Sequence, residues 1–198
     1  MANSDKPNGA RPVGTLSGAP ISGTVRSYLA DGSGSDIFIG DFVEMNDDGF
    51  IDVAAAASVE LIGVCVGFQN AQPGQTDGVT DHFMSGATDV DRQKKYYDAS
   101  ADGEMYILVA QGPDVLYEIQ TDGTITFTDI GNNAEIVDTA GDTTRGISQQ
   151  ELSATTTAAT AQLRIVGPVN RVDNEVASAN SRWIVRINEN HYTKLAGL

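Results

Sequence analysis

The chain contains 198 residues, of which 40% are hydrophobic, 21 are glycine and 6 are proline. This composition excludes a collagen, a coiled coil and a long disordered tail, and it is typical of one globular domain with or without a small appendage. The net charge of -15 disfavours a broad electrostatic grip on DNA, RNA or an anionic membrane surface.

Residues 1–20 contain Pro7, Pro12 and Pro20 together with three glycines, and they show no apolar periodicity. Such a segment predicts an extended N-terminal arm that does not pack as an element of its own. An arm of this kind is either frayed or ordered on a neighbouring molecule. We therefore divide the chain into an arm over 1–20 and a β-rich domain over 21–198.

From Ile21 onward, short apolar runs are separated by Asp-Gly pairs. Asp-Gly favours tight β-hairpin turns, because glycine accepts the positive φ that these turns require. The clearest hairpin joins residues 42–45 to residues 50–53 through the turn Asn46-Asp47-Asp48-Gly49.

A further strand is predicted over 61–68, and its alternation gives it one bulky and one thin face. The bulky face consists of Ile62, Val64, Val66 and Phe68, and the thin face includes two glycines. A thin face allows another backbone or sheet to approach closely. Residues 105–110 are apolar on both sides, which predicts a central, buried strand.

Alternating apolar residues predict more strands over 115–120, 124–128, 163–166 and 183–187. In the last of these, Trp183, Val185 and Ile187 share one face, and Arg182, Ile184 and Arg186 share the other. Residues 69–97 are polar and weakly patterned, so we predict a long loop or insertion there. Residues 152–157 are predicted as a loop or an edge strand. The whole pattern predicts an all-β fold, a small antiparallel barrel or sandwich of short strands.

One local motif resembles a calcium-binding loop. It spans residues 44–52, but the twelfth position of that loop would be Ala55, where a bidentate carboxylate is required. The flanking residues are predicted strands rather than helices, so a hairpin turn is the better interpretation.

No other motif points to a reaction. Cys65 is alone between two valines and is interpreted as a small buried hydrophobic residue. His82 and His191 lie far apart in the sequence and do not form a zinc motif with a single cysteine. We find no nucleophile elbow and no phosphate-binding glycine loop. No catalytic, cofactor-binding or metal-ligating residue is assigned, no cofactor is expected, and the sequence favours a protein that is not an enzyme.

Charge is unevenly distributed along the chain. No Lys or Arg occurs between Ser27 and Asp91, a stretch with twelve acidic residues, whereas the C-terminal part contains Arg164, Arg171, Arg182 and Arg186. Two interpretations remain open. The acidic stretch is a solvated face, or the acidic and basic ends of the molecule meet complementary partners. No apolar run is long enough to predict a membrane-spanning helix.

The order of short motifs resembles that of the small β-barrel decoration (cement) proteins on the heads of tailed bacteriophages. The motifs are Ile21-Ser-Gly-Thr-Val25, Ile39-Gly-Asp-Phe-Val43, Asp48-Gly-Phe-Ile-Asp-Val-Ala54 and Ile62-Gly-Val-Cys-Val-Gly-Phe68. The stretches 163–175 and 183–191 are similar to the ends of many phage virion proteins. The resemblance extends over most of residues 21–192.

The resemblance implies a structural virion protein on the outer surface of the capsid. Its expected partners are the major capsid protein and other copies of itself, plausibly in a trimer, with no nucleic acid and no membrane. We expect the arm to lie on the capsid or on an adjacent copy, and its removal to weaken attachment without unfolding the β-rich domain. The candidate capsid-contact residues are Lys6, Pro7, Arg11, Pro12, Arg164, Arg171, Arg182 and Arg186.

Two other classes of function remain open. The first is another virion component, such as a part of the tail tube or a fibre, which shares the β-rich character. The second is a carbohydrate-binding module or a hydrolase. A deep pocket lined by convergent acidic and aromatic side chains would support the second class.

Overall fold

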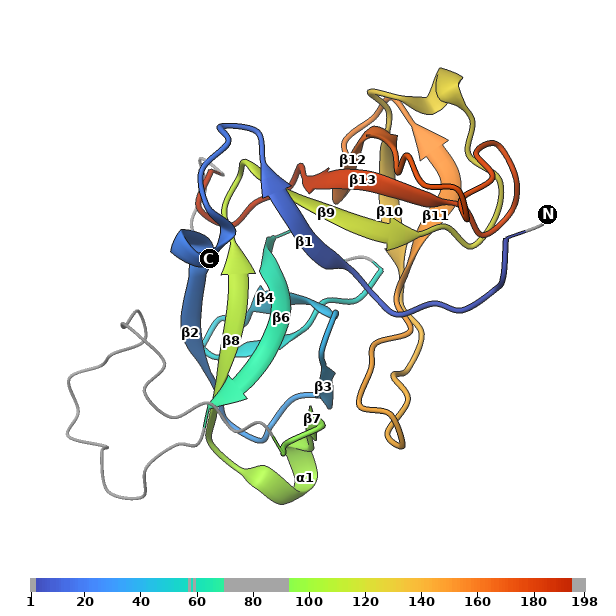
Figure 1. Ribbon diagram of the computed structural model, residues 1–198. Coiled ribbons are helices and arrows are strands. Elements are labelled where there is room, and N and C mark those ends of the chain that lie inside the picture. Colours follow the sequence, from blue (N-terminus) through green and yellow to red (C-terminus); the bar gives the residue numbers. More distant parts are fainter. Residues whose placement is uncertain (1–2, 57, 59, 70–92, 194–198) are drawn as a thin grey trace.

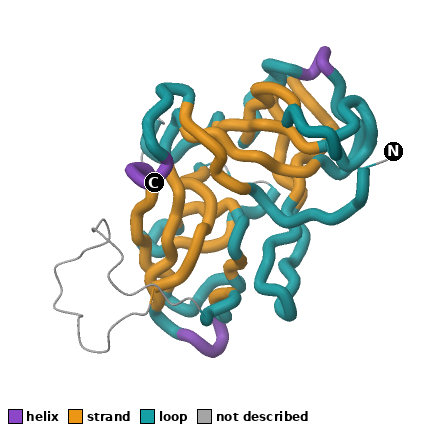
Figure 2. Tube along the Cα trace, in the orientation of Figure 1, coloured by secondary structure: helices purple, strands orange, loops and turns teal. Residues whose placement is uncertain are grey.

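The computed structural model describes residues 3–56, 58, 60–69 and 93–193 (Figure 1). Strands account for 45% of the structure and helices for 7%, which confirms the predicted all-β fold. The strands form two main antiparallel sheets (Figure 2). Of the two predicted architectures, a sandwich agrees with this arrangement, since the described strands form no closed barrel.

The larger sheet has six strands in the order β1-β9-β13-β12-β10-β11. Their bounds are β1 (Arg11–Thr15), β9 (Val115–Gln120), β13 (Arg182–Ile187), β12 (Leu163–Pro168), β10 (Asn133–Val137) and β11 (Glu151–Thr157). The strands predicted over 115–120, 163–166 and 183–187 are thus confirmed. Residues 152–157 form most of β11, and the edge-strand interpretation of that stretch is correct.

The smaller sheet has five strands in the order β2-β8-β6-β4-β5. Their bounds are β2 (Val25–Ala30), β8 (Met105–Gln111), β6 (Leu61–Gln69), β4 (Phe42–Met45) and β5 (Ile51–Val53). β8 lies between two strands, and Ile107 and Val109 are completely buried, as the prediction of a central strand requires.

Short elements lie at one end of the five-stranded sheet. β3 (Ile37–Phe38) pairs with β7 (Tyr96–Tyr97), and the short helix α1 (Ala99–Asp102) follows β7. Two 3₁₀ turns, η1 (Ile21–Thr24) and η2 (Phe127–Asp129), complete the elements. Of the loop predicted over 69–97, residues 70–92 lie outside the described residues, and Tyr96–Tyr97 form a strand instead.

The N-terminal segment is not the unpacked arm that we predicted. Arg11–Thr15 form β1, an edge strand that pairs antiparallel with β9. Pro12 is compatible with this pairing, because an edge strand can tolerate a residue that donates no hydrogen bond. Ala10 is also buried, and its N–H donates to the carbonyl of Gly40 at 2.8 Å. The segment is therefore part of the fold.

The predicted hairpin over 42–53 is confirmed. β4 and β5 pair antiparallel, with Val43 opposite Val53. Gly49 has a φ of 87°, and the N–H of Phe50 donates to Asp48 Oδ1 at 3.1 Å. Asp48 of the calcium-like motif thus stabilises a turn between strands.

β6 is buried on both faces, but the predicted division into a bulky and a thin face is wrong. Register shifts at Ile62 and at Val66 interrupt the alternation. Val64 consequently packs into the core beneath the six-stranded sheet, while Ile62 packs into the other core. The close approach expected at the small residues does occur at Gly63, where a Cβ would lie 2.2 Å from the carbonyl oxygen of Ala110.

The strand predicted over 124–128 is also wrong. Phe127–Asp129 form the 3₁₀ turn η2, which begins with a capping box. The hydroxyl and the N–H of Thr126 both contact Asp129 Oδ2, at 2.9 Å. This side-chain capping competes with strand pairing, which explains why the alternation of Ile125 and Phe127 predicted a strand that does not form.

The two sheets share a core. The cluster beneath the six-stranded sheet includes Phe42, Leu61 and Val64 from the five-stranded sheet. The rings of Phe42 and Tyr117 meet edge to face, with centroids 5.5 Å apart. This contact joins a strand of each sheet within the shared core.

Candidate functional site

Four of the predicted contact residues lie on the same face of the six-stranded sheet. Trp183, Val185 and Ile187 of β13 point into the core, so Arg182 and Arg186 point away from it, as predicted. Arg164 lies between two core residues of β12, and Arg11 lies opposite Glu118 of β9. We call this outward surface, which carries Arg11, Arg164, Arg182 and Arg186, the arginine face.

One row across the arginine face places two guanidinium groups beside each other. The row consists of four direct cross-strand neighbours, one on each strand: Leu116 on β9, Arg186 on β13, Arg164 on β12 and Asn133 on β10. The Nε of Arg164 donates to Asn133 Oδ1 at 3.0 Å. The side chain of Arg186 makes no hydrogen bond or ion pair with any residue that the structure describes. Like charges directly opposite each other destabilise a sheet, so an external anion is favoured at this row.

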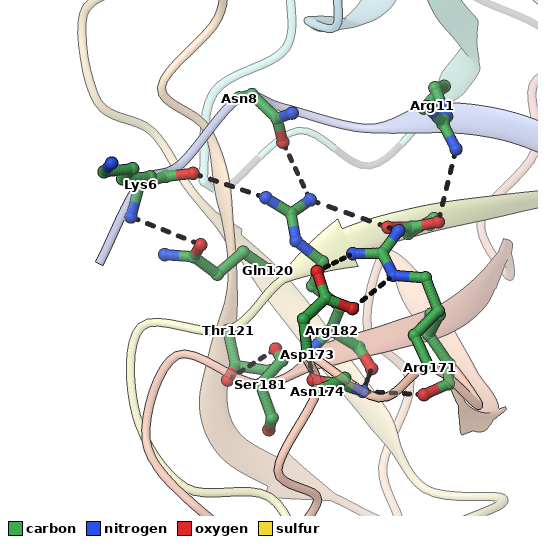
Figure 3. A network of polar contacts seen from close by, with 12 residues as sticks. Lys6, Asn8, Arg11, Gln120, Thr121, Arg171, Asp173, Asn174, Ser181 and Arg182 are labelled. Carbon is green, nitrogen blue, oxygen red and sulfur yellow. Dashed lines mark hydrogen bonds and ion pairs between the residues drawn. The ribbon is translucent and has the colours of Figure 1, made fainter. Parts of the chain in front are cut away.

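The second group of arginines surrounds a buried carboxylate (Figure 3). Only 7% of the Glu118 side chain is exposed, and its Oε1 accepts a hydrogen bond from Arg171 Nη1 at 2.9 Å. Arg182 Nη1 lies 3.7 Å from the same oxygen, and Arg11 Nη2 lies 3.6 Å from Oε2. We call Glu118 with these three arginines the Glu118 cluster. Three guanidinium groups lie near this carboxylate, and Arg171 also pairs with the carboxylate of Asp173, so two carboxylates face three guanidinium groups.

The N-terminal segment is held against the Glu118 cluster by polar contacts. The Nη1 of Arg182 donates to Asn8 Oδ1 at 3.0 Å. Arg171 also binds Asp173, with Nε to Oδ1 at 3.0 Å. Burial, together with repulsion from the guanidinium groups of Arg171 and Arg11, lowers the pKa of Arg182, although Glu118 opposes the shift. The structure thus brings Lys6, Arg11, Arg171 and Arg182 together and leaves Arg164 and Arg186 in a separate row.

A cavity of about 600 Å³ opens between the N-terminal segment and the loop that joins β12 to β13. Among the described residues that line it, three are cationic, two are anionic and none is aromatic; the charged ones are Lys6, Arg171, Arg182, Asp173 and Glu175. In the same loop, Ala177 and Asn180 have φ values of 62° and 57°. Positive φ is costly for a residue with a side chain, so packing must hold the loop in this conformation.

A second cavity, of about 340 Å³, lies beside β3 and the loop that follows β10. Asp36, Asp41 and Asp138 line it together with Phe38. Asp41 is 2% exposed, and its Oδ2 accepts a hydrogen bond from the N–H of Phe38 at 2.7 Å. Burial raises the pKa of Asp41 to about 7, hydrogen bonds from Ser148 and Phe38 oppose the shift, and the charge of Asp138 adds to it.

The other residues singled out in the sequence are placed as follows. Cys65 is completely buried, which confirms its interpretation as a core residue, and burial raises the pKa of its thiol. His191 follows β13, and its Nδ1 lies 3.1 Å from Glu60 Oε2. Tyr97 is buried and Tyr96 stacks on Phe38 with ring centroids 4.8 Å apart. His82 lies outside the described residues.

Within the described part of the chain, no cluster of three or more His, Cys, Asp or Glu residues is arranged to hold a metal ion. None of the helices in that part is long and apolar enough to cross a membrane.

Glu118 is the functional candidate that the sequence analysis missed. Its alternation with Val115, Tyr117 and Ile119 already placed it on the outward face of a strand. Its burial was not foreseeable, because the covering arginines come from three segments distant in sequence. Comparisons of this chain with family models, with curated proteins and with solved structures found no match.

Proposed function

We propose that this chain is a structural virion protein that binds the outside of an assembled bacteriophage capsid and stabilises it across subunit seams. The motif order described above supports a virion role. The observation that carries the proposal furthest is the arginine face, where no carboxylate of the described residues pairs with Arg164 or Arg186, although the chain has a net charge of -15.

The arginine face has the composition of a protein-binding surface. Half-buried Leu116 and Ile184 and the exposed Val166 lie on it among the arginines. Protein interfaces are enriched in arginine and combine an apolar centre with polar groups at the rim. A partner that presents carboxylates would relieve the repulsion between Arg164 and Arg186 and would bury these apolar side chains.

The proposed mechanism needs no catalytic group or cofactor. A protein that binds only the assembled shell shifts the equilibrium toward that state by mass action. Specific attachment requires an interface of roughly 1,200–2,000 Å² of buried surface. Repeated over many equivalent positions, such contacts would resist outward pressure from packaged DNA.

The first test is the copy number of this chain in purified particles from its source, measured by quantitative mass spectrometry against the most abundant shell protein. Near-stoichiometric amounts are expected. A handful of copies would instead favour a tail or fibre component, and complete absence would overturn the virion role.

The second stage of the test addresses the arginine face. Purified Arg186→Gln and Arg164→Gln proteins are added to particles stripped of this chain, and the bound fraction is measured by co-sedimentation. Loss of a good charged contact typically costs about tenfold or more in affinity. Arg145→Gln is the matched control, because Arg145 is exposed on a loop away from the arginine face. Equal binding by all three variants would show that attachment does not use this face.

The acid-lined second cavity favours one alternative, a carbohydrate-binding module or hydrolase. It combines three aspartates with the ring of Phe38. However, Asp36 Oδ1 already accepts a hydrogen bond from the N–H of Ala99 at 3.0 Å, and Asp41 is bound to the backbone of Phe38. These carboxylates therefore have structural partners, which is why we place this function second.

A further inference from the structure

The connection between β10 and β11 covers the second cavity. Residues 138–146, which we call the β10–β11 loop, extend from the six-stranded sheet to the side of β3 (Figure 1). Residues 138–141 and 143 belong to the lining of the cavity, together with Asp36, Phe38 and Asp41. The loop therefore forms one wall of a space whose remaining lining includes a buried carboxyl group.

The β10–β11 loop rests on β3 and β7 through close contacts at two glycines. A Cβ built on Gly141 would lie 2.3 Å from the ring of Phe38, and one built on Gly146 would lie 2.4 Å from the carbonyl oxygen of Lys95. Residues 138–140 and 143–145 are exposed, and no side chain of the loop belongs to either hydrophobic core. Displacing the loop would thus expose little apolar surface, and segments of this kind open locally at low cost.

The outer part of the β10–β11 loop is held together by its own hydrogen bonds. The N–H of Gly146 donates to the carbonyl oxygen of Asp142 at 2.7 Å, and the N–H of Thr144 donates to Asp142 Oδ1 at 2.9 Å. A hydrogen bond from Lys95 Nζ to the carbonyl oxygen of Thr144, at 3.1 Å, ties this part to the residue before β7. The internal bonds survive if the loop moves as a unit, whereas the exposed lysine contact does not.

The charged groups that line the second cavity are all acidic. Among the described residues of the lining, Asp36, Asp41 and Asp138 carry carboxyl groups, and there is no lysine or arginine. On the β6 side of Asp41, burial raises the pKa of the Cys65 thiol, so this neighbour is neutral. The other charged residues of the surrounding elements do not belong to the lining; they are Asp52, Lys95, Asp142 and Arg145.

Ionisation of Asp41 is unfavourable while the loop is in place. Burial, with a contribution from the charge of Asp138, raises the pKa of Asp41 to about 7, although hydrogen bonds from Ser148 and Phe38 oppose the shift. The backbone of Asp41 cannot move away, because its carbonyl oxygen accepts from Cys65 N–H at 2.8 Å and its N–H donates to Phe38. Relief must come from water reaching Asp41 and from a larger distance to Asp138, and displacement of the β10–β11 loop provides both.

We propose that the β10–β11 loop is a pH-controlled flap, closed over the second cavity while Asp41 holds its proton and displaced from it as Asp41 ionises. Displacement hydrates Asp41 and uncovers the ring of Phe38. The ratio of open to closed molecules should rise up to about tenfold per pH unit between about pH 4 and pH 7, and level off above, because the open state binds the proton less strongly. The flap belongs to the free chain and is independent of the function proposed above.

Arg145 provides a direct readout of the flap. Arg145 is exposed, but Gly146, which follows the bond that trypsin cleaves, is buried against Lys95. Trypsin should therefore cleave after Arg145 in the open state. The initial cleavage rate, measured by mass spectrometry of the fragments, is divided at each pH by the rate for Asp41→Asn, which cancels the pH dependence of trypsin itself. This ratio should rise at least roughly tenfold between about pH 5 and about pH 7. A ratio that does not change with pH would overturn the proposal.

A second variant tests the carboxylate on the loop itself. Asp138→Asn removes the charge that repels ionised Asp41, so cleavage after Arg145 at neutral pH should be slower than in the wild type. Asp47→Asn makes the same change of charge at an exposed hairpin turn away from the cavity and should be cleaved like the wild type. Equal effects of these two substitutions would contradict the role of Asp138.

A second cleavage site separates local opening from unfolding of the whole chain. Arg186 lies in β13, between two core residues, so trypsin reaches the bond after it only when the six-stranded sheet unfolds. At neutral pH, cleavage after Arg145 should be at least roughly tenfold faster than cleavage after Arg186. Equal rates would show that the loop opens only by global unfolding, and the flap would then be excluded. Circular dichroism of each variant establishes that the fold is retained.

Discussion

Asp41 is a buried carboxyl group at the place where the loop after β10 covers the five-stranded sheet. Burial raises its pKa from the ordinary value of 3.8 to about 7, with a further contribution from the charge of Asp138. Because the pKa is higher in the folded state than in the unfolded chain, the folded state retains the proton more strongly. The resulting stabilisation is complete below about pH 4 and is lost as the pH rises through 7.

Asp41→Asn should remove this dependence on pH. The asparagine carbonyl can still accept the hydrogen bond from Phe38 N–H, and the amide carries no charge at any pH. Relative to the wild type, the variant should gain up to about 1.4 kcal/mol of unfolding free energy for each pH unit between about 4 and 7. Urea unfolding at several pH values measures the difference.

Asp31→Asn is the control for this prediction, because its shift has the opposite sign. Hydrogen bonds from Ser33 lower the pKa of Asp31, so the wild-type carboxylate stabilises the fold increasingly as the pH rises. Asp31→Asn should therefore lose stability relative to the wild type over the acid range. A constant difference between wild type and Asp41→Asn at all pH values would contradict the assignment to Asp41.

Single residues were predictable where the local pattern determines their environment. Cys65 between two valines was predicted to be buried, and it is. Arg182 and Arg186 were placed on the outward face of their strand by alternation alone, which is also correct. The Glu118 cluster was not predictable, since its members come together only through the pairing of β1 with β9 and the loop after β12.

At the scale of elements, β1 makes the N-terminal segment a part of the folded domain. Its residues pair with β9 and contribute Arg11 to the Glu118 cluster, and the preceding Ala10 enters the core. Gly9 is tightly enclosed, because a Cβ there would lie 2.4 Å from the carbonyl oxygen of Gly40. The expectation that this segment could be removed without affecting the fold is therefore revised.

Deletion of residues 1–15 should destabilise the whole protein. It removes the β1–β9 hydrogen bonds, which contribute about 1 kcal/mol each, and it exposes the edge of β9. We expect a loss of roughly 3 kcal/mol or more in unfolding free energy, measured by chemical denaturation. Leu16→Ala, at an exposed position directly after β1, retains the β1–β9 hydrogen bonds and serves as the control, with little change expected. An unchanged unfolding midpoint after deletion of residues 1–15 would show that β1 is dispensable.

The elements that were predicted and those that were missed differ in a physical way. β4, β6, β8 and β13 carry runs of large apolar residues, and all were found from the sequence. In β10, Asn133 and Glu135 alternate with the two core residues, and β2 contains Arg26 and Ser27, so neither strand gives a strong apolar signal. β1 contains a proline, and η2 replaces a strand because Thr126 and Asp129 cap it. Tertiary pairing therefore determines that β1, β2 and β10 form strands, and side-chain capping determines that η2 forms instead of a strand.

At the scale of the whole molecule, the two sheets are joined by buried polar as well as apolar contacts. Gln150 Oε1 accepts from Phe42 N–H at 2.8 Å, and its Nε2 donates to the carbonyl of Ala54 at 3.0 Å. Gln162 links β10 to the chain after β5, with its Nε2 donating to the carbonyl oxygens of Ala55 and Ser58 at 2.8 Å. Breaking such contacts leaves buried polar groups unsatisfied, so separating the sheets is costly.

The two sheets should therefore unfold as one cooperative unit, and the chain contains a probe in each. Trp183, the single tryptophan, is completely buried in the six-stranded sheet, and Cys65, the single cysteine, is completely buried in the five-stranded sheet. Tryptophan fluorescence and thiol labelling should report the same unfolding midpoint in urea. Phe42→Ala removes the ring that contacts Tyr117 and should lower the unfolding free energy by about 3–5 kcal/mol, with an equal shift at both probes. Val172→Ala, at a fully exposed loop position, should shift neither. Labelling of Cys65 in Phe42→Ala while Trp183 fluorescence remains native would show that the five-stranded sheet opens independently, and the shared core would then not couple the two sheets.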